Sequence, residues 1–278
     1  MTNIGFNQVC IKKQQIHHEY ELQRQFALET LERYSGSDTK DFQPFILITN
    51  FPRYVDCFAQ EFGCNIVEGS MFKVAHCPKK NISILDFKIG SPAAALVMDL
   101  CAFLPCYGML LLGMCGGLRE DYKIGEYFVP VASIRGDATS DFYFPPEVPA
   151  MANFTVQKHV SAFLEKKKVD YHIGITHTTN KRFWEFNNEF RKRLQATRPQ
   201  VVEMECATLF AASYYHRLPL GALLLISDIP LQPSGVKTKS SSEMIFKKYM
   251  PEHVQMGVKI MQELDKVPRL KEYRKHVH

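Results

Sequence analysis

Short apolar runs alternate along the chain with segments in which apolar residues recur every three or four positions. The runs predict buried strands at 45–50 (FILITN), 81–90, 109–118, 126–135, 171–179 and 221–228 (GALLLISD). The periodic segments predict helices at 16–34, 91–104, 201–215 and 250–267. Because the strands are apolar without strict alternation, we expect one α/β domain whose sheet is covered by helices on both faces.

The start of the second helix carries a clear sequence signal. Ser91 is the expected N-cap and Pro92 the expected first helical residue, in the order GSPAAALVMDL. In sheets of this class, ligands bind beyond the carboxyl ends of the strands. The polar residues and glycines that follow the predicted strands are therefore the candidate site, at Thr49-Asn50, Gly90-Ser91, Gly113 to Gly117, Thr176 to Asn180 and Ser227-Asp228.

Composition narrows the class of protein. The 278 residues are 46% hydrophobic and 23% charged, with 34 basic and 29 acidic residues, a net charge of +5. So small an excess predicts no nucleic-acid partner but tolerates an anionic small molecule. We see no membrane-spanning run and no secretory leader, and expect a cytoplasmic protein without a membrane partner. Eight cysteines without a CxxC spacing indicate neither a disulfide framework nor a zinc site.

Three acidic residues stand beside apolar segments. Glu203 and Glu205 occur in VVEMECATLF, and Asp228 ends the apolar run LLLISD. A buried carboxylate without a partner lowers the stability of the fold by several kcal/mol, and removing the partner of a buried ion pair costs roughly 3–5 kcal/mol. Carboxylates in such places therefore often serve a function. The alternative is that these acids lie at the ends of elements, solvated or capping a helix.

VVEMECATLF and LLLISD, with Glu205 and Asp228 23 residues apart, resemble the signature of the nucleoside phosphorylase and nucleosidase superfamily. The segments GSPAAALVMDL, GMCGGLREDYKIGEYFVPVASIR and GITHTTNKRFWEF follow the order of that superfamily. Within it, GMCGGLRE, the pattern TTNxRxWE and SDIPL are most similar to the catalytic domain of the AMP nucleosidase family. The resemblance covers roughly residues 30 to 265.

The resemblance implies a single-domain three-layer α/β sandwich around a mixed, largely parallel twisted sheet. It also implies a short form without a large regulatory domain. We expect a helical extension at 1–30, the catalytic domain at 31–265 and a basic tail at 266–278. Members of this superfamily assemble as homo-oligomers, so a dimer-based assembly, up to a hexamer, is expected here.

The resemblance also assigns roles to residues. Asp228 would be the general acid that protonates the purine near N7, and Ser227 would assist in binding the base. Glu205 would stay ionised and hold the ribose hydroxyls, while Met204 packs on the ribose face. The base would stack on aromatic residues of GITHTTNKRFWEF, Phe183 or Trp184, unless these anchor the loop. Glu203 is expected to be structural.

Two departures from the family patterns change the expected reaction. Phosphorolytic members carry Arg and Thr or Ser where this chain has Leu111 and Met114, which cannot hold inorganic phosphate. We therefore expect water as the nucleophile. Methylthioadenosine nucleosidases place an acid after the first strand, where this chain offers Asn50 and Arg53. This loss argues against that substrate and leaves the residue that activates water unassigned.

A 5′-phosphate requires cations or N–H donors. Arg53 is the first candidate, Lys237 and Lys239 the second, and Arg182 the third, with Ser91 contributing through its helix N-terminus. A neighbouring subunit is a further source of such groups. His76, His177 and Cys115 lie near matching motifs, and core packing explains them adequately.

The sequence thus predicts hydrolysis of AMP to adenine and ribose 5-phosphate, without a metal or an organic cofactor. One alternative is a nucleosidase or phosphorylase that acts on another purine nucleoside or nucleotide. The other, from a different class, is a catalytically silent sensor that binds purine nucleotides.

Overall fold

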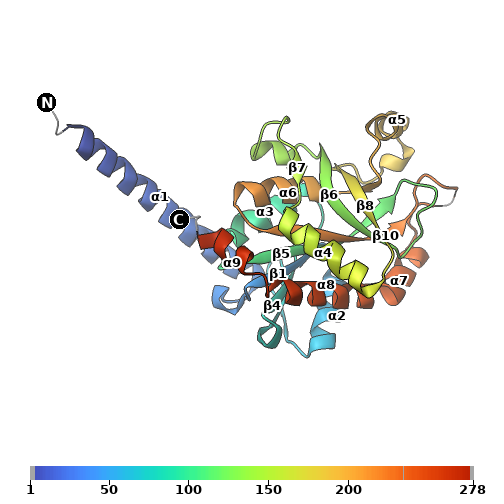
Figure 1. Cartoon of the computed structure of the whole chain (residues 1–278), viewed down its shortest axis with the longest axis horizontal. Coiled ribbons are helices and arrows are strands. Elements are labelled where there is room, and N and C mark those ends of the chain that lie inside the picture. Colours follow the sequence, from blue (N-terminus) through green and yellow to red (C-terminus); the bar gives the residue numbers. More distant parts are fainter. Residues whose placement is uncertain (1–3, 234, 276–278) are drawn as a thin grey trace.

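A mixed sheet forms the centre of the computed structural model, which describes residues 4–233 and 235–275 (Figure 1). Ten strands are found in this part of the chain. They are β1 Phe45–Thr49, β2 Ile66–Glu68, β3 Lys73–Cys77, β4 Ile82–Asp86, β5 Gly108–Gly117, β6 Tyr127–Gly136, β7 Ala150–Met151, β8 Tyr171–Thr179, β9 Val201–Glu203 and β10 Leu220–Asp228. Of the expected strands, all six are present.

Helices cover the sheet on both faces, as Figure 1 shows. They are α1 Ile4–Ser35, α2 Pro52–Phe62, α3 Ser91–Cys101, α4 Phe154–Lys167, α5 Asn188–Thr197, α6 Cys206–Tyr215, α7 Lys239–Lys248, α8 Met250–Leu264 and α9 Pro268–Lys275. One apolar core lies between the sheet and α3 and α6. A second core lies between the sheet and α2, α4 and α8. The expected three-layer α/β architecture is therefore confirmed.

Part of the sheet closes on itself, which the sequence did not indicate. β10 pairs in parallel with β5 and antiparallel with β6. β6 and β9 both pair in parallel with β8, and β9 pairs antiparallel with the last residues of β5. These five strands form a ring, and β1, β4, β3 and β2 extend from β5 as an open sheet. The ring brings strands of opposite direction to one place.

Two local predictions are wrong. Residues 201–215 are not one helix, because Val201–Glu203 forms β9 and the helix α6 begins only at Cys206. The first three residues pair with β5 and β8, a long-range contact that overrides their helical spacing. Ser91 is not the N-cap of α3, because Gly90 holds that place at a φ of 96°. The hydroxyl of Ser91 instead donates to the carbonyl of Met204 at 2.9 Å.

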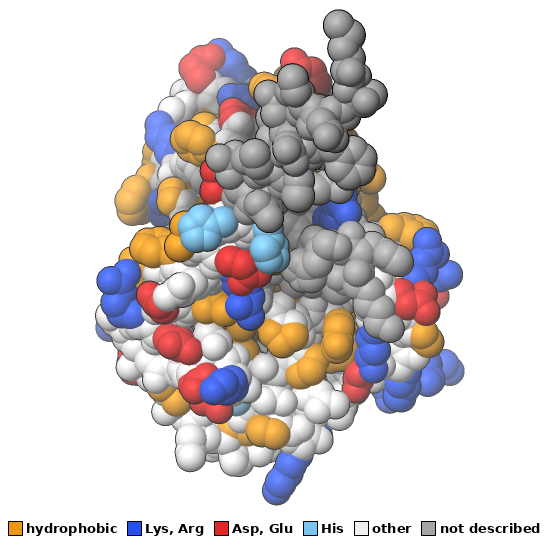
Figure 2. Space-filling view, turned by 90° about the vertical axis from the view of Figure 1, so that its left-hand side faces the viewer, with side chains coloured by type: hydrophobic (Ala, Val, Ile, Leu, Met, Phe, Trp, Pro, Cys, Tyr) orange, Lys and Arg blue, Asp and Glu red, His pale blue; other side chains and the backbone are white. Residues whose placement is uncertain are grey.

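The N-terminal helix α1 extends beyond the body of the molecule. α1 projects away from the sheet and runs to Ser35, past the expected boundary at residue 30 (Figure 1). On the described part of the face that bears α1, acidic and basic side chains are intermingled with apolar ones (Figure 2). Within the described ranges, none of the helices has both the length and the apolar character that a bilayer crossing requires. The division into three segments stays a prediction.

Candidate active site

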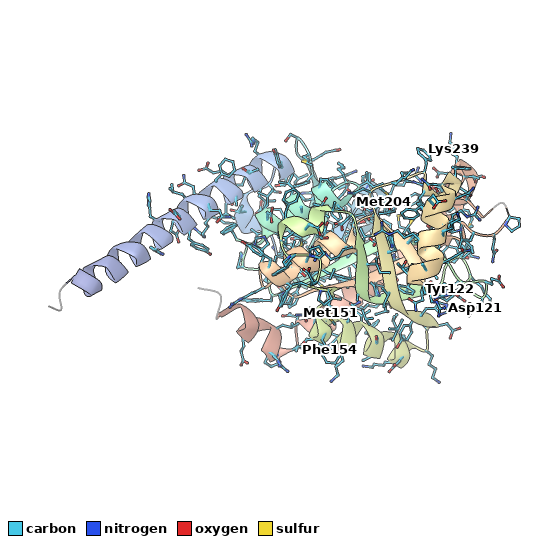
Figure 3. All side chains as sticks on the ribbon, turned by 90° about the horizontal axis from the view of Figure 1, so that it is seen from above. Asp121, Tyr122, Met151, Phe154, Met204 and Lys239 are labelled. Carbon is cyan, nitrogen blue, oxygen red and sulfur yellow. The ribbon has the colours of Figure 1, made fainter. Side chains whose placement is uncertain are left out.

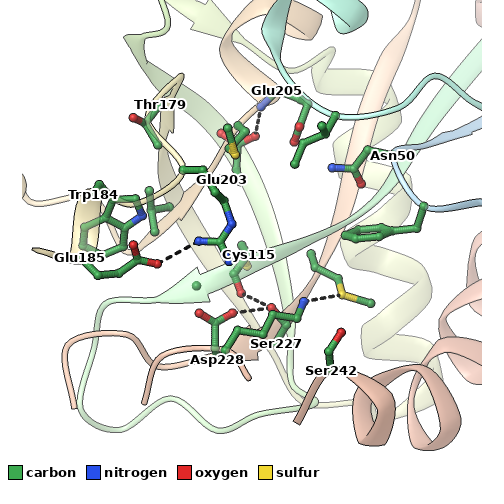
Figure 4. Close-up of a pocket in the computed structure, with 18 of the residues that line it drawn as sticks. Asn50, Cys115, Thr179, Trp184, Glu185, Glu203, Glu205, Ser227, Asp228 and Ser242 are labelled. Atoms are coloured by element: carbon green, nitrogen blue, oxygen red, sulfur yellow. Dashed lines mark hydrogen bonds and ion pairs between the residues drawn. The ribbon is translucent and has the colours of Figure 1, made fainter. Parts of the chain in front are cut away.

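A pocket of about 380 Å³ opens where the carboxyl ends of β1, β5 and β10 meet β8 and β9. β5 is ten residues long, and its last residues pair with β9, which runs the opposite way. Because of this pairing, the carboxyl ends of β5 and β9 both lie at the cavity although the two strands run in opposite directions. Its lining includes Asn50, Phe51, Ile89, Met114, Cys115, Thr179, Arg182, Trp184, Glu185, Glu203, Met204, Glu205, Ser227, Asp228, Lys237 and Ser242 (Figure 4).

Asp228 ends the buried central strand β10 and faces the pocket. The hydroxyl of Ser227 lies 2.6 Å from its Oδ1 and 3.3 Å from the carbonyl oxygen of Cys115. Burial raises the pKa of Asp228 above its ordinary value, while Ser227, Lys237 and Arg182 act in the opposite direction. A carboxyl group that keeps its proton closer to neutral pH is suited to donate that proton.

Glu205 lies on another wall of the pocket and is almost fully buried. Its Oε1 accepts a hydrogen bond from the N–H of Gly90 at 2.8 Å, and the side chain of Asn50 is a second partner. Burial and the nearby charge of Glu203 raise the pKa of Glu205 to about 8. Near pH 7 these surroundings therefore favour the protonated carboxyl rather than the ionised form expected from the sequence. Hydroxyl donors from a sugar would shift the balance back toward the ionised form.

Glu203 is held by the backbone of the turn that follows it. Its Oε2 accepts the N–H groups of Glu205 and Cys206 at 2.7 and 2.6 Å. Its Oε1 accepts the hydroxyls of Thr176, at 3.2 Å, and Thr178. These bonds satisfy free donors at the start of α6 and fix the position of Glu205. The structure thus agrees with a structural role for Glu203.

Two cations reach the pocket. Lys237 follows β10, and its Nζ lies 3.3 Å from Sδ of Met114. Burial lowers its pKa, and the charge of Asp228 acts against this shift. Arg182 enters from the loop after β8, with its Nη1 3.1 Å from Oε1 of Glu185. Both had been candidates for binding a phosphate, and both line the cavity.

Three other predicted residues lie outside the lining. Arg53 is exposed on α2 and pairs with both carboxylate oxygens of Glu243 at 2.8 Å. Ser91 is fully buried and bonded to the Met204 carbonyl, so its hydroxyl supports the wall rather than facing the cavity. Phe183 is 71% exposed and is not among the lining residues. Arg53 and Ser91 are therefore not among the residues that line the pocket, and their part in phosphate binding stays a prediction.

Three further residues named from the sequence also lie elsewhere. Lys239 is exposed at the start of α7, at the edge of the molecule in Figure 3, whereas Met204 lines the pocket. His76 bonds to the hydroxyls of Ser37 and Ser83. His177 is fully buried and packs edge-on against the ring of Phe190 at 5.3 Å, where burial lowers its pKa to about 4.

The loop after β8 supplies two side chains to the pocket. Trp184 is buried against Phe190 and Val202 while it lines the cavity, and its stacking on a base stays a prediction. Glu185, its neighbour, was missed by the sequence reasoning. Its side chain is only 5% exposed, and Oε2 has no hydrogen-bond partner among the described residues. The pattern TTNxRxWE contained this residue, but its spacing alone gave it no role.

The arrangement matches a known family. Residues 44–250, a range that contains all ten strands of the described part of the chain, match the model described as the phosphorylase superfamily. The chain belongs to the phosphorylase superfamily. This match agrees with the resemblance in the motifs around Glu205 and Asp228.

Several members of the phosphorylase superfamily are similar to this chain. An AMP nucleosidase of Escherichia coli (strain K12) is 29% identical in an alignment 280 positions long. The alignment covers 84% of this chain and 57% of that relative. The chain thus spans less than two thirds of its length. The structure of an AMP nucleosidase from Bacteroides thetaiotaomicron VPI-5482 is 32% identical, with a TM-score of 0.78 over 88% of this chain and 98% of the other.

More distant members show the same fold. A uridine phosphorylase structure from Vibrio fischeri ES114 has a TM-score of 0.74 at 17% identity, over 84% of this chain and 96% of the other. A uridine phosphorylase of Thermococcus kodakarensis is 27% identical over 157 residues, which cover 52% of this chain and 57% of the relative.

Two positions separate this chain from the phosphate-binding pattern described above. Leu111 is buried in the core beneath α3 and does not reach the pocket. Met114 does line the pocket, with its sulfur beside Nζ of Lys237. Neither side chain offers a charge or a hydroxyl to a phosphate. Lys237 is the cation at this part of the cavity.

Proposed function

We propose that this protein hydrolyses the N-glycosidic bond of AMP and releases adenine and ribose 5-phosphate. The observation that carries the proposal is the pair of buried carboxyls in one pocket, Asp228 and Glu205, set in different surroundings. Two carboxyls with separate environments can take two roles, one as proton donor and one as a ligand for the sugar. The similarity to AMP nucleosidases supports this choice of substrate.

In this mechanism, Asp228 donates its proton to the purine as the glycosidic bond breaks. Protonation makes the base a better leaving group, and the ribosyl group gains positive charge. Glu205, which loses its proton to solvent when the sugar binds, accepts hydrogen bonds from the ribose hydroxyls, and its negative charge stabilises that positive charge. Met204 packs on the sugar and Trp184 on the base. Lys237 is the cation we propose for the 5′-phosphate.

The nucleophile is water in this proposal, because Leu111 and Met114 provide no phosphate site. Asn50 is the residue we propose to hold that water. Its Oδ1 is buried and has no partner among the described residues, while its side chain contacts Glu205. A carbonyl oxygen in this position can accept a hydrogen bond from water beside the sugar.

The decisive experiment measures base release from AMP, adenosine, methylthioadenosine and IMP, with and without inorganic phosphate. We expect adenine from AMP without phosphate, and a fall in kcat of about 10²–10⁴-fold in Asp228→Asn. Release that requires phosphate would make the protein a phosphorylase. Binding of AMP without any release would make it a sensor.

We also propose that the protein forms a homo-oligomer. Apolar side chains are exposed on β6, β7, β8 and the first turn of α4, namely Val131, Met151, Phe154, Ile173 and Ile175. Met151 and Phe154 lie near each other in Figure 3 and border the same surface hollow. Contiguous exposed apolar surface is typical of protein contacts. Light scattering after gel filtration tests this, and a monomer at micromolar concentration would contradict it.

A further inference from the structure

Glu185 holds a buried carboxylate oxygen that no protein group satisfies among the described residues. Oε1 is paired with Arg182 at 3.1 Å, while Oε2 is buried without a hydrogen-bond partner. An unsatisfied buried acceptor is costly, so it is rare unless a ligand supplies the donor. Because Glu185 lines the pocket, a bound ligand can provide that donor.

The position of Glu185 indicates which part of a nucleotide it meets. Glu185 and Asp228 line the same pocket, and the charge of Glu185 adds to the burial that raises the pKa of Asp228. Figure 4 shows Trp184, Glu185 and Asp228 on one side of the pocket, with Asn50 on the other. A base that stacks on Trp184 and is protonated by Asp228 would lie between these two side chains, away from the sugar ligands. With Asp228 facing N7, the substituent at position 6 is the next group along the same edge of the purine.

The chemistry of a carboxylate distinguishes purines at that position. Adenine carries an amino group at C6, which donates hydrogen bonds, whereas hypoxanthine and guanine carry a carbonyl oxygen, which accepts them. A carboxylate paired with arginine has only acceptors to offer. The carboxylate thus bonds with the 6-amino group and repels a 6-carbonyl oxygen. A purine that leaves this buried carboxylate oxygen unpaired is strongly rejected.

We propose that Glu185 selects the base, with its free Oε2 accepting a hydrogen bond from the 6-amino group of adenine. This inference rests on the proposed function, because it assumes that Asp228 faces N7 of a purine nucleotide. Arg182 holds the other oxygen and fixes the direction of the carboxylate. The loop after β8 thus sets the choice between 6-amino and 6-oxo purines.

The test compares kcat/KM for AMP, IMP and purine riboside 5′-monophosphate, which has hydrogen at C6. The wild type and Glu185→Gln are assayed together. Glutamine can turn its amide either to accept or to donate a hydrogen bond, so the variant should discriminate less between the two purines. We expect the ratio of kcat/KM for AMP to that for IMP to fall at least ~10-fold, the effect of losing one hydrogen bond to a charged group. The wild type should also prefer AMP over the compound without a 6-amino group, which tests the contact without any substitution.

Lys237→Gln is the matched control. AMP and IMP carry the same phosphate, so loss of a phosphate contact should change both values by the same factor and leave their ratio unaltered. If Glu185 only holds Arg182, Glu185→Gln will behave in this way too, and the inference is overturned while AMP hydrolysis stands. If the wild type cleaves no purine nucleotide, the proposed function fails and the inference fails with it.

Discussion

Glu203 offers a quantitative test of how the site is built, through the substitution Glu203→Ala. Its Oε2 is the acceptor for the N–H groups of Glu205 and Cys206, both in buried surroundings. The hydroxyls of Thr176 and Thr178 keep Ser133 as a partner when the carboxylate is removed. Two buried N–H donors are therefore left without an acceptor.

Each unsatisfied donor costs about 1–3 kcal/mol, so the two together cost ~2–6 kcal/mol. Removing the buried carboxylate offsets part of this, because its own desolvation is unfavourable. We expect the free energy of unfolding to fall by at least ~2 kcal/mol, a large share of the stability of a typical domain. Glu203→Gln is the matched control, because its carbonyl oxygen can take the place of Oε2, and it should lose clearly less.

The assay is urea unfolding followed by circular dichroism and by fluorescence. Trp184 is the single tryptophan and lines the pocket, so its emission reports on the site directly. Coincident transitions in both signals would justify a two-state treatment. The reasoning is refuted if Glu203→Ala is as stable as the wild type, or if alanine and glutamine destabilise equally.

Three further outcomes are expected. The pKa of Glu205 is about 8 in the folded protein and 4.5 ordinarily, so between these pH values the folded state holds a proton that the unfolded state has lost. The free energy of unfolding should therefore fall as pH rises through this range. Urea unfolding from pH 5.5 to 8 should show a shallower fall in Glu205→Gln, and parallel curves would contradict this. Lys237 favours the ionised form of Asp228, so Lys237→Met should raise the pKa of that acid and extend base release to higher pH. A profile of kcat against pH measures this, and an alkaline limb at the same or a lower pH than in the wild type would contradict it. Arg53→Gln should leave KM for AMP within about twofold, because an exposed ion pair away from the pocket contributes little. A selective rise in KM for AMP over adenosine would instead show that Arg53 contacts the phosphate, for example across a subunit interface.

The central strands could be predicted from the sequence because burial on both faces leaves a continuous apolar run. β8 and β10 are examples, and the run of β10 also marks Asp228 at its end. β9 could not be found in this way, because its three residues precede a helix and share its apolar spacing. Its strand pairing depends on β5 and β8, which no local pattern records.

The same distinction applies to the site. Asp228 and Glu205 lie in ordered motifs, so their presence in one pocket was expected from the resemblance. The sequence did not indicate that Arg53 pairs with Glu243, because the two residues are 190 positions apart in the chain. Glu185 was missed because a charged residue in a single 3-10 turn, Trp184–Phe186, follows no apolar period. Its significance appears only when burial, Arg182 and the unpaired oxygen are seen together.

The place of β10 between β5 and β6 has a consequence for how such an enzyme can diversify. Hydrogen bonds on both sides hold this strand, so its amides should be among the slowest to exchange with solvent. Asp228, the proton donor that we propose, is thereby carried by one of the most persistent strands of the sheet. The segments that carry Glu185 and Lys237 are loops, which tolerate insertion and replacement. New substrates can therefore be acquired by exchanging loops, while the bond-breaking step keeps its inherited position.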